Sequence, residues 1–266
     1  MDSVVGTISS FDKPPSPKSN LLETLLKYAR YASPHGRDNG PICRERSYSI
    51  ILPSKNKYMF KNVDIESWPR RSTYEFFRDY ADPFFNFTAN VDVTRLYRFC
   101  KDNDLSFSLA ALYFVLIAAN RIREFRIRLN GDRLIEFNTI HATQTILNED
   151  ETFSFAYFAM EADVFDFVSA GRKALETYKT MRSFDVETDR LDLVYCSVIP
   201  WVSFTSFKHA SRLDKTQTIP RIVFGKHFDD ADRKLMPLSV EVNHAIMDGL
   251  HVGKLFNFYQ AEIDRL

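Results

Sequence analysis

The alternation of apolar and polar residues near the C-terminal end of the chain predicts a strand that ends at a histidine. The apolar residues fall on one side and the polar residues on the other, the period of a half-buried strand: Leu238, Val240 and Val242 against Ser239, Glu241 and Asn243. The same period places His244 on the apolar side. Asp248 and Gly249 then break the pattern, and apolar residues follow at helical spacing up to Tyr259. We therefore expect an imidazole held where a strand ends in a tight turn before a helix.

Elsewhere, from residue 59 onward, the periodicity changes repeatedly between that of a helix and that of a strand. Helices are predicted at residues 72–80, 94–102, 108–122 and 163–182, and from about 250 to the end. Strands are predicted at residues 90–93, 152–160, 221–224 and 238–242, and within 191–203. Because strands and helices mix without strict alternation, the expected class is α+β, a mixed sheet with packed helices.

A hairpin is predicted around Asn130-Gly131-Asp132-Arg133, which separates two apolar runs. Arg126 and Arg128 alternate with apolar residues in its first arm. An anion-binding patch is one interpretation of these arginines, since others lie nearby in the sequence. The alternation favours a solvated strand face, and this is the expectation we adopt.

Residues 1–58 differ from the rest of the chain. Prolines among serines and lysines at residues 14–18 predict an extended lead. Asn20 and Glu23 then provide an N-cap and N3 pair for a short amphipathic helix that ends near Tyr31. We expect its apolar stripe to dock on the main body, with a partner-binding helix as the alternative. The expected organisation is an N-terminal extension, residues 1–58, followed by one domain, residues 59–266.

Composition excludes several classes of function. The chain has 266 residues, of which 45% are hydrophobic, so it can bury a full core. Basic and acidic residues number 35 each, and a net charge of zero provides no long-range field for nucleic acid. The longest apolar run, residues 109–119, is too short to span a bilayer, and residues 1–7 lack a basic and apolar leader. We expect a cytoplasmic protein with neither a nucleic-acid nor a membrane partner.

Familiar cofactor and metal motifs are also missing. The three cysteines are widely spaced and odd in number, which argues against a disulfide framework or a zinc site. The sequence contains no Gly-x-Gly-x-x-Gly fingerprint, no phosphate loop and no Gly-x-Ser-x-Gly elbow. His244, Asp248 and His251 have a spacing that suits a metal, but only if a helix runs through His244. The alternation before His244 contradicts such a helix, so no metal is expected.

Two interpretations of His244 remain open on the residues alone. A histidine on an apolar strand face is often a core residue with a satisfied hydrogen bond, and an aspartate before a helix is often only an N-cap. This is the more common case, and the alternative is that a neutral imidazole held rigidly at the end of a strand acts as a general base.

The segment Asn243-His244-Ala245-Ile246-Met247-Asp248-Gly249 matches the His-x-x-x-Asp-Gly signature of CoA-dependent acyltransferases. Together with segments 67–77, 151–154, 197–204 and 237–252, which match in the same order, it resembles the chloramphenicol acetyltransferase family over residues 59–266. Dihydrolipoyl acyltransferases and peptide-synthetase condensation domains share the signature. The chain shows no lipoyl or carrier domain, which disfavours those two. The resemblance implies the chloramphenicol acetyltransferase-like fold of the CoA-dependent acyltransferases.

The resemblance also implies a function and a set of site residues. An acetyl group would pass from acetyl-CoA to a hydroxyl of a small molecule, chloramphenicol or a related compound. His244 would be the general base, and Ser197 would donate a hydrogen bond to the oxyanion. Asp248 would pair with Arg70 and fix the loop that bears the histidine. The further implied contacts are Phe77, Phe153, Phe207 and Val223 at the acceptor, and Lys226 and His227 at CoA. A homotrimer with each active site between two subunits is implied as well.

Several positions depart from the family pattern. Asn243 replaces the first histidine of the usual pair, which is not the catalytic one. Phe77 and Val223 stand where the family has a tyrosine and a threonine at the acceptor, and His227 replaces a tyrosine near CoA. Because polar groups are missing from the acceptor pocket, we expect a less polar alcohol to be preferred over chloramphenicol. The alternative outside enzymes is a fold relative that binds a small molecule or a partner, with residues 1–58 as its docking element.

Overall fold

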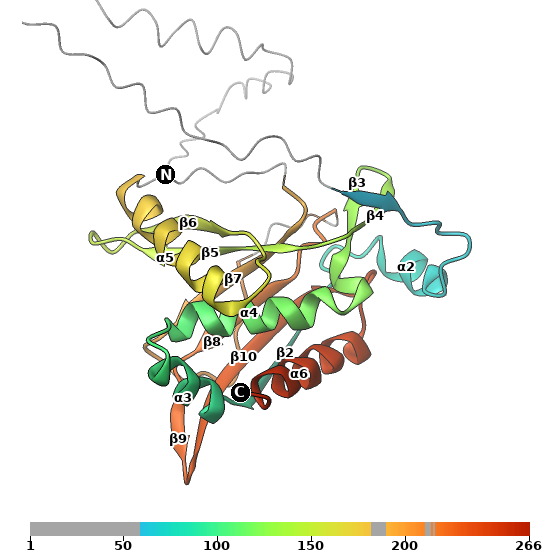
Figure 1. Cartoon of the computed structure of the whole chain (residues 1–266). Helices are drawn as coiled ribbons and strands as arrows, with labels where there is room; N and C mark the ends of the chain where they lie inside the picture. Colours follow the sequence, from blue (N-terminus) through green and yellow to red (C-terminus); the bar gives the residue numbers. More distant parts are fainter. Residues whose placement is uncertain (1–58, 182–189, 211–213, 215) are drawn as a thin grey trace, which may run out of the picture. The chain divides into compact units, whose positions relative to one another are not determined.

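The computed structural model describes residues 59–181, 190–210, 214 and 216–266. The expectations for residues 1–58 therefore lie outside the described residues. Within the described part of the chain, two sheets and a layer of helices confirm the predicted α+β class (Figure 1). None of the described helices is both long enough and apolar enough to cross a membrane.

The larger sheet has seven strands, in the order β2-β10-β8-β7-β5-β6, and β9 pairs with the beginning of β10. The strands are β2 (Phe84–Asp92), β5 (His141–Leu147), β6 (Phe153–Phe158), β7 (Leu193–Ile199), β8 (Arg221–Gly225), β9 (Phe228–Asp230) and β10 (Arg233–Asn243). The pairs β5–β7 and β7–β8 are parallel, and the other pairs are antiparallel. The carboxyl ends of β7 and β8 therefore lie side by side.

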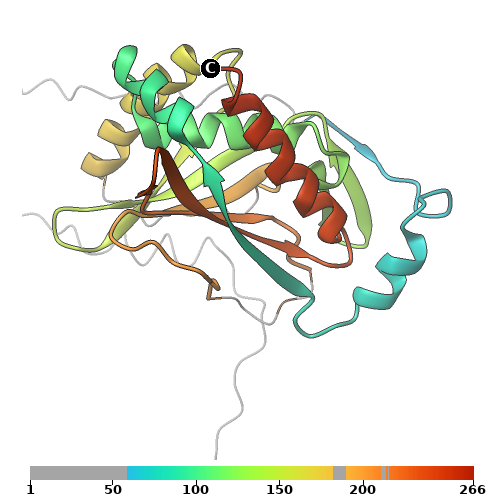
Figure 2. The ribbon, with the colours of Figure 1, turned by 90° about the horizontal axis from the view of Figure 1, so that it is seen from below.

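Helices cover one face of this sheet (Figure 2). They are α3 (Thr94–Asp102), α4 (Phe107–Asn120), α5 (Val164–Met181) and α6 (Gly249–Ile263). In α4 all residues from Leu109 to Leu116 are buried, and such a helix is apolar around its whole circumference because it is packed on every side. The short α2 (Arg71–Phe77) precedes β2. The other face of the sheet carries no described helix.

The smaller sheet has the order β1-β4-β3, and its strands are β1 (Phe60–Asn62), β3 (Ile127–Asn130) and β4 (Arg133–Phe137). The predicted hairpin is confirmed, with Gly131 at φ +60° in its turn, a conformation that glycine adopts without strain. A short 3₁₀ helix, η1 (Arg123–Arg126), leads into the first arm.

The prediction that Arg126 and Arg128 form a solvated strand face is wrong. Arg128 is fully buried, and its guanidinium donates to the carbonyls of Phe125 and Ile127, each at 2.8 Å, and of Leu193 at 2.7 Å. The small sheet meets the beginning of β7 here, so the polar face of the hairpin is covered by another part of the chain. Burial lowers the pKa of Arg128 to about 9.

The prediction of a half-buried strand at residues 238–242 is also only partly right. The strand exists, and its apolar side is fully buried, but Ser239, Glu241 and Asn243 on the other side are at most 2% exposed. Because β10 lies inside the sheet, its polar side chains find partners on neighbouring segments. Glu241 forms an ion pair with Arg221, and the Asn243 amide donates to the carbonyl of Gln217 at 2.9 Å.

Candidate active site

His244 is the first residue after β10, and its ring lies between two aromatic side chains. It stacks on Phe77 with ring centroids 4.0 Å apart and planes 10° apart, and it tilts against Phe85 at 4.6 Å. Phe85 is the cross-strand partner of Val242, so the ring lies on the apolar side that the sequence period predicts. Its Nδ1 is buried and has no hydrogen-bond partner among the described residues. The ring as a whole is nevertheless partly exposed, as a general base must be to reach a substrate.

The turn that carries His244 is closed by its own hydrogen bonds. The carbonyl of Asn243 accepts from the backbone N–H groups of Ile246 and Met247, both at 3.0 Å. The Asn243 side chain accepts from the N–H of Ala245 at 2.9 Å. Asn243 therefore shapes this turn, and a backbone with its donors satisfied holds His244 in one position.

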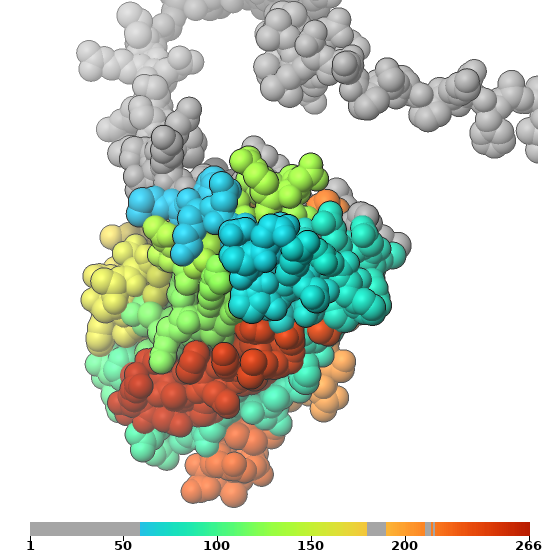
Figure 3. Space-filling view, turned by 90° about the vertical axis from the view of Figure 1, so that its right-hand side faces the viewer, coloured from blue at the N-terminus to red at the C-terminus, as the bar shows by residue number. Residues whose placement is uncertain are grey.

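Arg70 connects this turn to the segment before α2. Its Nε donates to the carbonyl of Ile246 at 2.9 Å, and its Nη2 lies 3.4 Å from the carbonyl of His244. Its Nη1 forms an ion pair with the carboxylate of Asp248. The structure thus brings Arg70 and Asp248 together, and the region of α2 lies beside the C-terminal segment (Figure 3).

His251 supports the same turn, a role that its spacing alone did not reveal. Its Nδ1 accepts from the backbone N–H of Asp248 at 3.0 Å, and its Nε2 lies 3.6 Å from the carboxylate of Glu124. Burial lowers the pKa of His251, against the opposing effect of Glu124. The neutral ring is the form that accepts this hydrogen bond. No cluster of three or more His, Cys, Asp or Glu side chains suited to a metal occurs among the described residues.

Ser197 lies on β7 and points away from the helices. Its sequence neighbour Val198 lines a cavity together with residues of α4, so alternation along the strand places Ser197 on the opposite face. The Ser197 Oγ is 3.2 Å from the Oγ1 of Thr145 on β5. Val223 is its cross-strand partner on β8 and is fully buried.

Ser197 and His244 are far apart within one chain. From Ser197 the register leads through Val223 to Ser239 on β10, a step of two strands or about 10 Å. His244 follows five residues later, about 17 Å along the strand direction. The Cα atoms of the two residues are thus separated by roughly 20 Å, and the side chains belong to opposite faces.

Two further residues assigned to the acceptor lie on other segments of the fold. Phe153 is exposed on β6, which three strands of the sheet separate from β10. Phe207 follows β7 and packs edge-on against His209, with ring centroids 5.0 Å apart. Of the four acceptor residues implied by the resemblance, only Phe77 touches the imidazole of the same chain.

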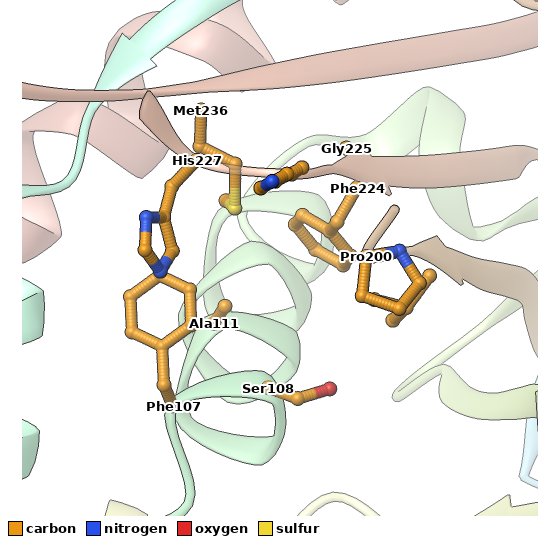
Figure 4. A pocket seen from close by; sticks show the side chains of 10 residues that line it. Phe107, Ser108, Ala111, Pro200, Phe224, Gly225, His227 and Met236 are labelled. Atoms are coloured by element: carbon orange, nitrogen blue, oxygen red, sulfur yellow. The ribbon is translucent and has the colours of Figure 1, made fainter. Parts of the chain in front are cut away.

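Lys226 and His227 come together at a cavity of about 350 Å³ beyond the carboxyl ends of β7 and β8 (Figure 4). Its lining is mainly apolar and consists of Phe107, Ser108, Ala111, Val198, Pro200, Phe224, Gly225, Lys226, His227 and Met236. The ring of His227 meets that of Phe107 edge-on at 5.6 Å. Burial and the nearby positive charge of Lys234 lower the pKa of His227, so its ring is neutral near pH 7. An apolar cavity beside a lysine suits an aromatic group that carries phosphate.

This fold is the one shared by the CoA-dependent acyltransferases. A solved chloramphenicol acetyltransferase superposes with a TM-score of 0.69 at 26% identity, covering 77% of this chain and 100% of that one. A probable dihydrolipoamide acetyltransferase from Listeria monocytogenes shares the fold, with a TM-score of 0.53 at 17% identity over 77% of this chain and 94% of that one.

Sequence comparison narrows the class to one family. The family model described as chloramphenicol acetyltransferase matches residues 58–260. The chloramphenicol acetyltransferase of Proteus mirabilis is 29% identical over 203 residues, covering 76% of this chain and 94% of that protein. Chloramphenicol acetyltransferase 3 of Escherichia coli is 29% identical, covering 76% of this chain and 95% of that protein. The chain belongs to the chloramphenicol acetyltransferase family and is an acyltransferase of that type.

Proposed function

We propose that the protein is an acetyl-CoA-dependent O-acetyltransferase whose acceptor is a small alcohol less polar than chloramphenicol. The observation that carries this proposal is the placement of His244. Its ring is partly exposed, it lies between Phe77 and Phe85, and its turn is fixed by Arg70. A rigidly held and partly exposed imidazole can take a proton from a bound molecule.

In the proposed mechanism, His244 removes the proton of the acceptor hydroxyl as the oxygen attacks the thioester carbonyl. The resulting tetrahedral oxyanion accepts a hydrogen bond from Ser197, and such bonds are strongest where charge develops in the transition state. Collapse of the intermediate breaks the carbon–sulfur bond, and His244 gives the proton to the departing CoA thiolate. The products are the acetyl ester and free CoA, and His244 is again neutral.

The separation of Ser197 and His244 supports an oligomeric enzyme. A base must lie within about 3 Å of the oxygen whose proton it abstracts, and roughly 20 Å separates the two residues in one chain. One chain cannot therefore supply both groups to one carbonyl carbon. We propose the homotrimer implied by the resemblance, in which His244 of one subunit faces the Ser197 side of the neighbouring sheet.

The cavity beside Lys226 and His227 is the proposed site for the nucleotide end of CoA. Its apolar lining suits the adenine ring, and the exposed ammonium of Lys226 suits a phosphate. Ser197 lies near the carboxyl end of β7, and Val198 and Pro200 at that end line the cavity. The pantetheine arm would then pass from the cavity around this end of the sheet to Ser197.

Two aromatic or aliphatic side chains support the preference for a less polar acceptor. Phe77 covers one face of the imidazole, and fully buried Val223 lies beside Ser197. Neither side chain offers a hydrogen bond. A site that does not bind a hydroxyl group has no means of preferring a polyol over a simple alcohol.

A thiol-release assay tests the proposal. Acetyl-CoA is supplied with 1-butanol, cyclohexanol, benzyl alcohol or chloramphenicol, and free CoA is measured for the wild type and for His244→Ala. We expect alcohol-dependent release by the wild type, highest with a simple alcohol, and a loss of about 10²-fold or more in the variant. Absence of release with every acceptor, or a folded variant that keeps a tenth of the activity, would contradict the proposal. A monomer in analytical ultracentrifugation would contradict the proposed assembly.

A further inference from the structure

A row of aligned side chains, most of which carry a hydroxyl, crosses the larger sheet on the face opposite the helices. The register aligns Ser197 of β7 with Val223 of β8, Val223 with Ser239 of β10, and Ser239 with Thr88 of β2. Cross-strand partners point to the same face, so these side chains are neighbours. Val223 is the one member of this row without a polar group.

Val223 divides the row into two separate hydrogen-bond groups. On one side, the Ser239 hydroxyl accepts from the Asn86 amide at 2.8 Å and lies 3.1 Å from the Thr88 hydroxyl. On the other side, Ser197 and Thr145 lie 3.2 Å apart. With Val223 between the groups, Thr145 is the only side chain hydrogen-bonded to Ser197 in the described part of the chain.

We propose that Thr145 is a positioning residue for Ser197, an inference that rests on the proposed function. A hydroxyl has one proton to donate and two lone pairs that accept. Ser197 cannot donate its proton to the oxyanion and to Thr145 at the same time. Thr145 must therefore donate to Ser197 during the reaction, which directs the Ser197 proton toward the substrate and polarises it.

The location of Thr145 suits this role. It lies in β5, which pairs with β6 on one side and β7 on the other, so its backbone is held on both sides. Its β-branched side chain restricts χ1, so the hydroxyl has few alternative positions. A rigid donor next to Ser197 reduces the reorganisation required when negative charge develops.

Thr143 provides a matched control on the same strand. It lies two residues before Thr145, so it faces the same side of the sheet. Its hydroxyl is buried and has no hydrogen-bond partner among the described residues. Thr143→Val and Thr145→Val make the same chemical change at neighbouring sites, but only the second removes a hydrogen bond to Ser197.

The test uses the full-length protein, acetyl-CoA and the alcohol with the highest turnover among those named above. Thr145→Val should lower kcat about five- to tenfold, the effect of one neutral hydrogen bond, and leave KM for acetyl-CoA and the melting temperature unchanged. Thr145→Ser should restore most of the activity, because it keeps the donor. Thr143→Val should match the wild type. If valine at 145 does not pack, Thr145→Ala removes the same donor.

A double-mutant cycle distinguishes positioning from a general effect. Once Ser197→Ala has removed the group being positioned, adding Thr145→Val should cause no further loss. A Thr145→Val enzyme within twofold of the wild type, or equal losses with and without Ser197, would overturn the inference. If Ser197→Ala is slow and Thr145→Val is normal, only this inference fails. Inactivity of the wild type would overturn the proposed function and this inference together.

Discussion

Replacing Arg70 with methionine should loosen the turn that carries His244. The substitution keeps the aliphatic part of the side chain and removes the guanidinium. The lost contacts are the hydrogen bond to Ile246 at 2.9 Å, the longer one to His244 at 3.4 Å, and the ion pair with Asp248. Breaking a buried ion pair costs about 3–5 kcal/mol, and each hydrogen bond to a charged group contributes about 1.5–3 kcal/mol.

Exposure reduces that cost. The Arg70 side chain is 11% exposed but that of Asp248 is 38% exposed, so water can solvate the carboxylate that remains. We therefore expect Arg70→Met to lower the free energy of unfolding by about 3 kcal/mol, the lower end of the range. Displacement of His244 by even ~1 Å should lower kcat by about 10²-fold.

Urea denaturation and initial rates measure both effects in a double-mutant cycle with Asp248→Asn. The combined variant should lose less stability than the sum of the single variants, by about 1 kcal/mol, because the two side chains share one interaction. Arg71→Met is the matched control. Arg71 is adjacent in the sequence, but its ion pairs with Glu66 and Glu75 are exposed, so the loss should stay within about 0.5 kcal/mol. Strict additivity together with a normal kcat for Arg70→Met would refute this reasoning.

Three further predictions concern the acceptor, pH and the buried arginine. Val223→Thr combined with Phe77→Tyr should raise kcat/KM for chloramphenicol by about tenfold or more in the thiol-release assay, and efficient acetylation by the unmodified protein would contradict this. Burial lowers the pKa of His141 and of His251 in the folded protein. Below about pH 6.5 the unfolded chain therefore binds more protons than the folded protein, which lowers the free energy of unfolding. The urea midpoint should therefore be lower at pH 5.5 than at pH 7.5, and equal midpoints would exclude this linkage. Arg128→Met should cost about 3 kcal/mol in urea denaturation by leaving buried carbonyls unpaired, with kcat unchanged; an unchanged urea midpoint would contradict it.

The sequence was informative where one local pattern decides the structure. The helix at residues 94–102 and the hairpin at Gly131 occur as predicted, because apolar spacing and turn chemistry act over a few residues. It was uninformative where polar side chains are buried by distant segments. The strand β5 was missed because Thr143, Gln144 and Thr145 give no apolar alternation, yet all three lie inside the sheet.

In the candidate active site, too, the sequence predicted what local patterns determine and missed what contacts between distant segments determine. Periodicity placed His244 at the end of a strand, but its catalytic interpretation depended on the resemblance, and so did the pairing of Arg70 with Asp248. Neither Thr145 nor His251 carries a sequence signal that separates it from an ordinary strand threonine or a helix histidine. Their contacts depend on the pairing of β5 with β7 and on the packing of η1 near α6, which are tertiary properties.

The alternation along β7 has a consequence for the shape of the co-substrate. Ser197 and Val198 are consecutive residues, yet one faces the side of the sheet that carries Thr145 and the other lines the cavity on the helix side. The sheet thus separates the two sites, and a molecule that binds at both must bend around the carboxyl end of β7. If CoA binds as proposed, the length of its pantetheine arm is then decisive, because an acyl donor with a shorter arm would reach the cavity or Ser197 but not both. The protein would thus select its acyl donor by the length of the donor molecule as well as by the chemical groups that the donor carries.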